Sequence, residues 1–111
     1  MIISLFKLKP ISCNRPNILD ILRFAEEKVR LKRGCLGCGV YEKFDDGRTI
    51  LYLEQWQSKK ELHQHIQSKL YLRILNAMDL CREEPDICLY EVLNTKHLEL
   101  VKALRLDNDL D

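Results

Sequence analysis

The chain of 111 residues carries 18 Lys and Arg against 17 Asp and Glu, a formal net charge of +1 with its histidines neutral. This length suits one domain with one core, and the balanced charge gives no electrostatic reason to expect nucleic acid or an anionic membrane as partner. No apolar run approaches the roughly 20 residues of a membrane-spanning helix, and the first residues lack a basic leader, so we expect a soluble cytoplasmic protein.

The amino-terminal third predicts a strand followed by a helix. Residues 2–9 are rich in aliphatic side chains and stop at Pro10, as a strand does. Asn14 is a candidate helix cap, and Pro16 suits the first helical turn. Basic residues precede Gly34, as is common at a helix end, so we expect an amphipathic helix of about five turns. Its apolar stripe is Ile18, Ile21, Leu22, Ala25 and Val29.

The next segment predicts a β-hairpin. Residues 36–44 and 49–57 have strand composition, and the Asp-Asp-Gly sequence at 45–47 supplies a turn between them. These two strands should be antiparallel neighbours. In the second strand, side chains alternate between two faces. One face carries Ile50, Tyr52, Glu54 and Trp56, and the other carries Leu51, Leu53 and Gln55.

A second helical region follows and carries a histidine, His65. Ser58 and Glu61 have the spacing of a capping box, which predicts a helix from about Lys59. The apolar stripe of this region does not fit one helix, but it fits two. We therefore predict a break near Ser68, whose hydroxyl would cap the second helix.

The carboxyl-terminal part predicts a fourth strand over 87–93, a short helix over 96–105 and a frayed tail over 107–111. The resulting βαββαβ order is the ferredoxin-like α+β arrangement, a four-stranded antiparallel sheet with helices on one face. We place the ferredoxin-like domain at 1–95 and assign 96–111 to a terminal helix and an acidic tail.

Both faces of the predicted sheet are apolar, which creates a packing problem. Leu51 and Leu53 alternate with Ile50 and Tyr52, so neither face has the polar character of a solvated one. Helices cover one face only. We expect a second copy of the chain to cover the other, giving a homodimer.

The sequence has five cysteines and no recognisable signal peptide, which suits a reducing compartment better than a disulfide framework. Cys35 and Cys38 have the spacing of a metal knuckle, but a closed zinc site needs four ligands and no second knuckle exists. The alternative is that the nearby glycines shape a turn and the small thiols pack beneath the strand. We expect no metal.

Three features together resemble one family. They are the Gly34–Cys38 segment, the Glu-x-Trp-x-Ser element within Leu53–Ser58, and His65 nine residues after Trp56. These features resemble the antibiotic biosynthesis monooxygenase domain, and the resemblance extends from the first predicted strand to the fourth. It implies a dimeric α+β barrel in the ferredoxin-like class.

Subgroups of that family differ at specific positions. Its anthrone oxygenases pair the tryptophan with an Asn and a Tyr where this chain has Tyr52 and Leu62. Its haem-degrading members hold iron with a His where this chain has Leu75 and Asn76, and have a Trp in place of His65. Haem ligation is therefore not expected.

The quinol monooxygenase group matches best, because its members have Glu, Trp and His at the positions of Glu54, Trp56 and His65. The resemblance implies a cofactor-independent monooxygenase that acts on a small aromatic diol with molecular oxygen. A deprotonated quinol can pass an electron to oxygen, so the protein must supply a base, a dry pocket and a donor for the developing anion.

On this resemblance His65 is the candidate base, since an imidazole titrates near neutral pH. Trp56 would form the pocket wall and offer its indole N–H. Glu54 and three tyrosines on neighbouring strands are candidate substrate-binding residues: Tyr41, Tyr52 and Tyr90.

Structural interpretations of the same residues remain open. His65 and Trp56 could simply pack in the core, and Glu54 could pair with a basic neighbour or with a partner subunit. The histidine could also shuttle a proton in an isomerase of a small hydroxyketone, without oxygen. A third possibility is a non-catalytic dimeric module that binds a small ligand. A thiol redox role for Cys35 and Cys38 ranks last, because no helix N-terminus directly follows them.

Overall fold

The computed structural model describes residues 1–107, so the predicted fraying of the tail falls almost wholly outside the described residues. Residues 1–107 form four strands, four α-helices and one short 3-10 helix, η1 (Ser12–Asn14). The strands are β1 (Ile2–Leu8), β2 (Cys35–Glu42), β3 (Ile50–Trp56) and β4 (Asp86–Glu91). The α-helices are α1 (Arg15–Val29), α2 (Lys59–Ile66), α3 (Lys69–Met78) and α4 (Leu98–Asp107). None of the helices in this range is long and apolar enough to cross a membrane.

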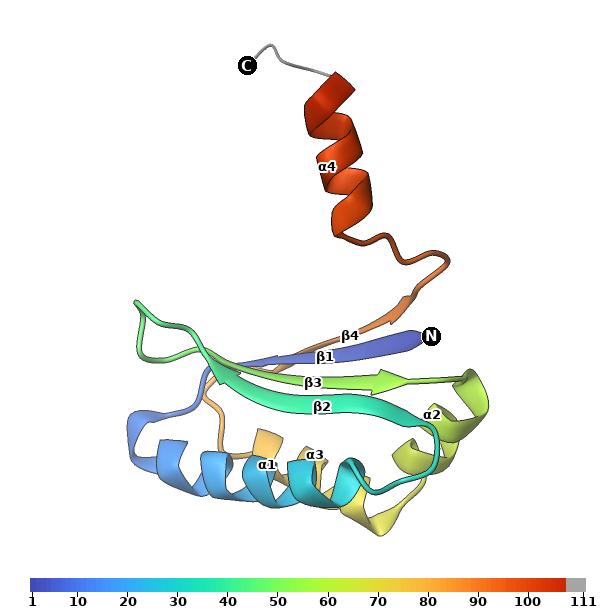
Figure 1. The fold of residues 1–111 in the computed structure, drawn as a ribbon. Coiled ribbons are helices and arrows are strands. Elements are labelled where there is room, and N and C mark those ends of the chain that lie inside the picture. Colours follow the sequence, from blue (N-terminus) through green and yellow to red (C-terminus); the bar gives the residue numbers. More distant parts are fainter. Residues whose placement is uncertain (108–111) are drawn as a thin grey trace.

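The strands form one antiparallel sheet in the order β2-β3-β1-β4, which confirms the ferredoxin-like fold. Helices α1, α2 and α3 lie on one face of the sheet, and α4 stands apart on the other side (Figure 1). We call the face covered by helices the inner face and the opposite one the outer face. The central strands β1 and β3 pair along their whole length, so the inner face at β3 lies in the middle of the fold.

The core lies between the inner face and helices α1 and α3. Alternate residues of β1 and β3 are buried, as period-two side-chain alternation requires. The aromatic ring of Phe6 meets those of Tyr52 and Tyr71 edge to face, with centroids 5.6 and 6.0 Å apart. The predicted apolar stripe of α1 is buried with one exception. Ile21 is only partly buried, whereas the other four residues are buried: Ile18, Leu22, Ala25 and Val29.

Two predicted helix caps, Asn14 and Ser58, occupy the cap position but do not make the predicted hydrogen bond to a backbone amide. Asn14 occupies the cap position of α1, but its side-chain amide donates to the carbonyl of Leu80 at 3.4 Å instead. Helix α2 begins at Lys59 as predicted, but the Ser58 hydroxyl donates to the Glu61 carboxylate and caps no backbone amide. In each case the side chain at the cap position binds another group in place of the helix amides: the Leu80 carbonyl for Asn14 and the Glu61 carboxylate for Ser58.

The break between α2 and α3 is confirmed. Ser68 is the cap of α3, and its hydroxyl oxygen accepts from the backbone N–H of Tyr71 at 3.2 Å. The same hydroxyl donates to the carbonyl of His65 at 2.6 Å. Ser68 therefore joins the end of one helix to the start of the next.

Helix α1 is shorter than predicted, at 15 residues or about four turns. Its end tightens through a hydrogen bond of 3.0 Å from the N–H of Lys32 to the carbonyl of Val29. Gly34 then has a φ of +84°, which a residue with a side chain rarely adopts. This turn directs the chain into β2.

Candidate active site

The carboxylate of Glu54 is the centre of a buried hydrogen-bond network on the inner face of β3. Tyr52, Glu54 and Trp56 share that face because they are two residues apart, and all three are fully buried. The Tyr52 hydroxyl donates to Oε2 at 2.8 Å, and the Trp56 indole N–H donates to Oε1 at 3.0 Å. A buried carboxylate is costly unless it is paired and hydrogen-bonded, and these neutral donors supply part of that compensation.

His65 of α2 supplies a third donor to the same carboxylate. Its Nε2 lies 2.8 Å from Oε2 of Glu54, and the residue is 2 % exposed. The imidazole packs between two rings, with centroids 4.9 Å from that of Trp56 and 5.1 Å from that of Tyr71. His63, two residues away on α2, is exposed, as the helical period predicts.

Lys32 completes the network from the turn after α1. Its Nζ lies 2.9 Å from Nδ1 of His65 and donates to the Ser68 hydroxyl at 3.1 Å. An ammonium can only donate, so Nδ1 accepts and the imidazole proton sits on Nε2, facing Glu54. Partial burial lowers the pKa of Lys32, and the negative charge of Glu54 opposes that shift.

A second branch of the network runs to the edge strand β2. The Cys38 thiol donates to the Tyr52 hydroxyl at 3.4 Å. Burial is the main cause that raises the pKa of Cys38, to about 12, and burial followed by the charge of Glu54 raises the pKa of Tyr52 far above its ordinary value. Both groups keep their protons at neutral pH and act as donors.

The structure gathers four of the predicted site residues and separates the other two. His65, Trp56, Tyr52 and Glu54 lie together. Tyr41 and Tyr90 lie on the outer face, where they pair in register with Leu51 of β3 and Ile3 of β1 and are 55 % and 50 % exposed.

Sequence reasoning did not find two neighbours of His65. Tyr71 belongs to the apolar stripe of α3, so its pattern resembles that of any core residue. Lys32 lies in a turn, where no periodicity relates it to His65. Its proximity to Gly34, which fixes the turn, is the only local signal.

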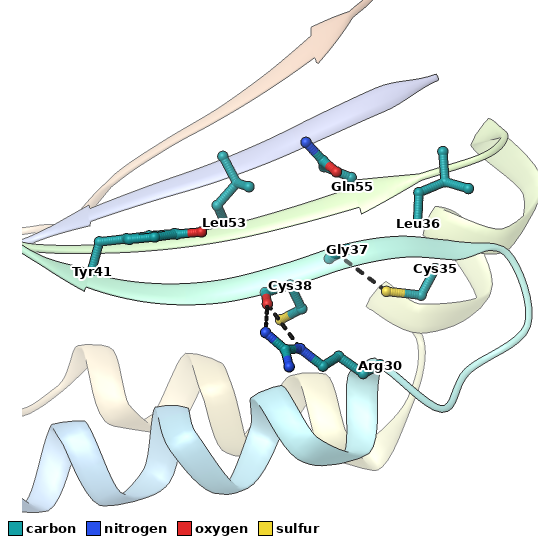
Figure 2. A pocket seen from close by; sticks show the side chains of 8 residues that line it. All are labelled: Arg30, Cys35, Leu36, Gly37, Cys38, Tyr41, Leu53 and Gln55. Carbon is teal, nitrogen blue, oxygen red and sulfur yellow. Dashed lines mark hydrogen bonds between the residues drawn. The ribbon is translucent and has the colours of Figure 1, made fainter.

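A surface pocket of about 420 Å³ borders the network at β2 (Figure 2). In Figure 2, Leu36, Leu53 and Gln55 point to one side of the sheet, and Arg30, Cys35 and Cys38 lie on the other. The guanidinium of Arg30 donates to the backbone carbonyl of Cys38 at 3.1 and 2.8 Å. Cys38 lines this pocket and also contacts Tyr52, so it lies between the pocket and the network.

Cys35 and Cys38, which have the spacing of a metal knuckle, make separate hydrogen bonds. The Cys35 thiol donates to the carbonyl of Gly37 at 3.4 Å, whereas that of Cys38 reaches Tyr52. Within residues 1–107, no group of three or more His, Cys, Asp or Glu side chains is placed to hold a metal ion. The thiols pack beneath the strand, as the structural interpretation predicted.

Comparison with known proteins gives one family match. Residues 1–77 match a family described as antibiotic biosynthesis monooxygenase. No match was found among curated protein sequences.

Solved structures share the fold. A candidate antibiotic biosynthesis monooxygenase from Deinococcus radiodurans superposes with a TM-score of 0.81 at 20 % identity, covering 88 % of this chain and 98 % of its own. A protein from Mycobacterium tuberculosis gives 0.79 at 20 % identity, with coverages of 86 % and 98 %. A conserved protein from Methanosarcina mazei gives 0.76 at 22 % identity, with coverages of 81 % and 90 %. Identities this low establish the fold and leave the reaction to be argued from the site.

Proposed function

Because the chain belongs to the antibiotic biosynthesis monooxygenase family, we propose that it is a cofactor-independent monooxygenase of a small aromatic diol of the quinol type. The observation that carries this proposal is the buried contact of 2.8 Å between His65 and Glu54 beside the Trp56 ring. A histidine oriented by a carboxylate is a recurring form of general base.

The proposed reaction needs no redox group on the protein, because the substrate supplies the electrons. A quinol and one molecule of oxygen give a hydroxyquinone and one molecule of water, so one oxygen atom enters the ring and the other leaves as water. The difficult step is deprotonation of a quinol hydroxyl, after which the electron-rich anion can reduce oxygen. The protein must therefore accept a proton in a dry, aromatic environment.

In this proposal His65 accepts that proton and Glu54 stabilises the imidazolium that forms. The carboxylate already accepts from Nε2, so the carboxylate itself need not move when the ring becomes charged. The Trp56 ring packs against the imidazole and supplies the aromatic environment. Its indole N–H is engaged with Glu54, so it orients the carboxylate instead of binding a substrate anion, and Tyr52 acts in the same way.

Oxygen uptake by the metal-stripped protein tests the proposal. Reduced naphthoquinones and anthrones would be offered as substrates, with nonenzymatic autoxidation subtracted. We expect uptake by the wild-type protein, loss to background in His65→Ala, and normal uptake in His63→Ala, which removes an exposed histidine from the same helix. Product analysis then separates oxygenation from oxidation.

Two outcomes would overturn this assignment. Retained uptake in a folded His65→Ala protein would remove His65 from the reaction. Turnover of a small hydroxyketone without oxygen, and none of any quinol, would favour an isomerase that uses the same proton acceptor.

A second candidate function is a non-catalytic module that binds a small ligand. The observation that favours it is the near-complete burial of His65, whose two ring nitrogens are both engaged by protein groups. Such a module predicts saturable binding of an aromatic ligand by calorimetry without oxygen uptake. The comparison of wild-type protein with His65→Ala distinguishes the two functions.

We also propose that the protein is a homodimer in which the outer faces of two sheets meet. The outer face is apolar, with partly exposed Ile3, Leu5 and Leu53 at its centre. Tyr41 and Tyr90 lie on the same face. Burying such a patch is favourable by about 25 cal/mol for each Å² of apolar surface removed from water.

The cysteines support a cytoplasmic location, which we propose as well. All five are free thiols, and one of them, Cys13, is exposed. Reduced thiols persist in a reducing compartment.

A further inference from the structure

We propose that Lys32 is a positioning residue for His65: its ammonium opposes protonation of the imidazole by donating to Nδ1, so that the ring proton lies on Nε2. The catalytic part of this inference rests on the function proposed above, whereas the protonation state of His65 does not. Lys32 is the one cation in hydrogen-bond contact with the imidazole among the described residues.

The turn between α1 and β2 holds Lys32 in place through its backbone. The carbonyl of Lys32 accepts from the N–H of Cys35 at 3.2 Å, and the carbonyl of Gly34 accepts from the N–H of Gln57 at 2.8 Å. A Cβ atom at Gly34 would overlap the side chain of Glu61, so the turn packs closely against α2. The ammonium is thereby directed at the end of α2, where His65 and Ser68 lie.

Three titratable side chains face the imidazole from three different elements. Glu54 of β3 approaches Nε2, Lys32 approaches Nδ1 from the turn, and Tyr71 of α3 packs edge to face against the ring. Burial, followed by the charge of Glu54, raises the pKa of Tyr71 to about 12, so this phenol is neutral at physiological pH. The charge of His65 is therefore decided by Glu54 and Lys32.

The two charges have opposite effects of similar size. The carboxylate favours an imidazolium and the ammonium opposes one, and their contact distances to the ring are 2.8 and 2.9 Å. Coulomb energies vary inversely with distance, so the two nearly cancel. The ammonium at Nδ1 therefore opposes protonation of the ring, and its removal would leave the carboxylate to act on His65 without an opposing cation.

This arrangement has a consequence for proton transfer. Nε2 already carries its proton and donates it to Glu54, so Nδ1 is the nitrogen that can accept a proton from a substrate hydroxyl. The ammonium of Lys32 occupies that position in the structure. A hydroxyl must replace the ammonium at Nδ1, and its proton then converts the ring to an imidazolium paired with Glu54.

Nitrogen NMR of the full-length protein with ¹⁵N-labelled histidine tests the protonation state directly. The wild-type protein should show His65 at neutral pH with a protonated Nε2 and an unprotonated Nδ1, assigned by comparison with His65→Gln. In Lys32→Met both nitrogens should be protonated at that pH, because the Glu54 carboxylate then acts on the ring without an opposing cation. Lys32→Arg should behave like the wild type.

Two further variants separate the charge from other effects. Lys32→Gln retains a donor for Nδ1 and much of the packing but removes the charge, so it should resemble Lys32→Met. Arg33→Met removes one positive charge from the next, exposed residue and should leave His65 neutral. A wild-type His65 already protonated on Nδ1, or a folded Lys32→Gln protein with an unchanged His65, would overturn the proposal.

The activity of the same variants separates this inference from the proposed function. If His65 is the base, Lys32→Gln should need a higher pH for oxygen uptake, by the same displacement that NMR records, and uptake at neutral pH should fall about tenfold for each unit. Wild-type protein that shows the expected NMR signals without any oxygen uptake would overturn the function and leave the assignment of Lys32 standing. Uptake with a pH profile that Lys32→Gln leaves unchanged would overturn the role of Lys32 and retain the function.

Discussion

Burial shifts the pKa values of the groups around Glu54 in opposite directions, according to whether the charged form of each group is positive or negative. It lowers the pKa of Lys32 and raises those of Cys38 and Tyr71, because in each case the uncharged form is favoured. The site therefore combines one buried carboxylate with a thiol and two phenols that hold their protons at neutral pH. A thiol that holds its proton is a poor nucleophile.

We predict that Cys38 is inert to thiol reagents in the folded protein. Its side chain is buried and its pKa is raised to about 12, whereas Cys13 is exposed. Brief treatment with a maleimide at about pH 7, followed by mass spectrometry of peptides, should label Cys13 and leave Cys38 unmodified until denaturant is added. Equal labelling of the two in the folded state would show that the inner face is open at β2.

At the residue scale, the sequence predicted the site as far as periodicity could. Alternation placed Tyr52, Glu54 and Trp56 on one face because a strand has a period of two. The approach of His65 to that face followed from the family resemblance. Lys32 could not be predicted, since its position depends on how a turn folds against a helix more than 30 residues later in the chain.

At the scale of secondary-structure elements, the carboxylate of Asp46 stabilises the hairpin turn between β2 and β3 through hydrogen bonds. The carboxylate of Asp46 accepts from the N–H groups of Arg48 and Thr49 at 2.9 and 3.0 Å and from the Thr49 hydroxyl at 2.7 Å. These hydrogen bonds, that of the Thr49 amide first, hold the pKa of Asp46 well below its ordinary value. Lys43 adds a more distant charge at 3.9 Å.

The lowered pKa of Asp46 gives its contribution to stability a definite pH dependence. The contribution of Asp46 to stability is complete above the ordinary carboxyl pKa of about 4. It is lost as the pH falls from there toward the pKa of Asp46 in the folded protein. We expect Asp46→Asn to lower the midpoint of thermal unfolding at neutral pH. The difference in midpoint between this variant and the wild type should narrow steadily below about pH 4. Circular dichroism melts between neutral and acid pH measure this.

Asp45→Asn is the matched control, because it removes the same charge from the preceding residue of the turn. The difference in thermal midpoint between Asp45→Asn and the wild type should not change with pH. A gap for Asp46→Asn that stays constant down to about pH 2 would show that its carboxylate does not stabilise the turn as an anion.

Element identities were predictable, and their ends were less so. The hairpin, the two-helix region with its break at Ser68 and the fourth strand all follow from periodicity and turn residues. The caps at Asn14 and Ser58 differ because each side chain binds another group: Asn14 donates to the backbone carbonyl of Leu80 and Ser58 donates to the Glu61 carboxylate. Helix α4 begins two residues later than predicted, at Leu98, and extends to Asp107.

At the scale of the whole molecule, the chain is more extended than a compact domain of its length. Its radius of gyration is 16.8 Å, against about 13 Å expected for a globular chain of this size. The excess reflects α4, which projects away from the sheet on the side of the outer face (Figure 1). Its apolar side chains Leu98, Val101 and Leu104 are each more than half exposed.

We expect wild-type protein at micromolar concentration to have about twice the chain mass of 13.1 kDa by light scattering. Leu53→Glu places a charge at the centre of the outer face, so it should shift the mass toward that of one chain while preserving the circular dichroism spectrum. Leu72→Glu is the control, since Leu72 is exposed on α3, away from that face. A single-chain mass for the wild type would contradict the homodimer.

The irregularity in β2 has a consequence for how relatives of this protein should be aligned. Cys35 pairs with Trp56 and Gly37 with Gln55, so Leu36 is an extra residue in the strand. Cys35 and Cys38 therefore face the same side, although they are an odd number of positions apart in the strand (Figure 2). A relative with a regular strand here would need one residue fewer to keep its turn in place. Matching such chains by strand alternation alone would assign the wrong residue to the position of Lys32.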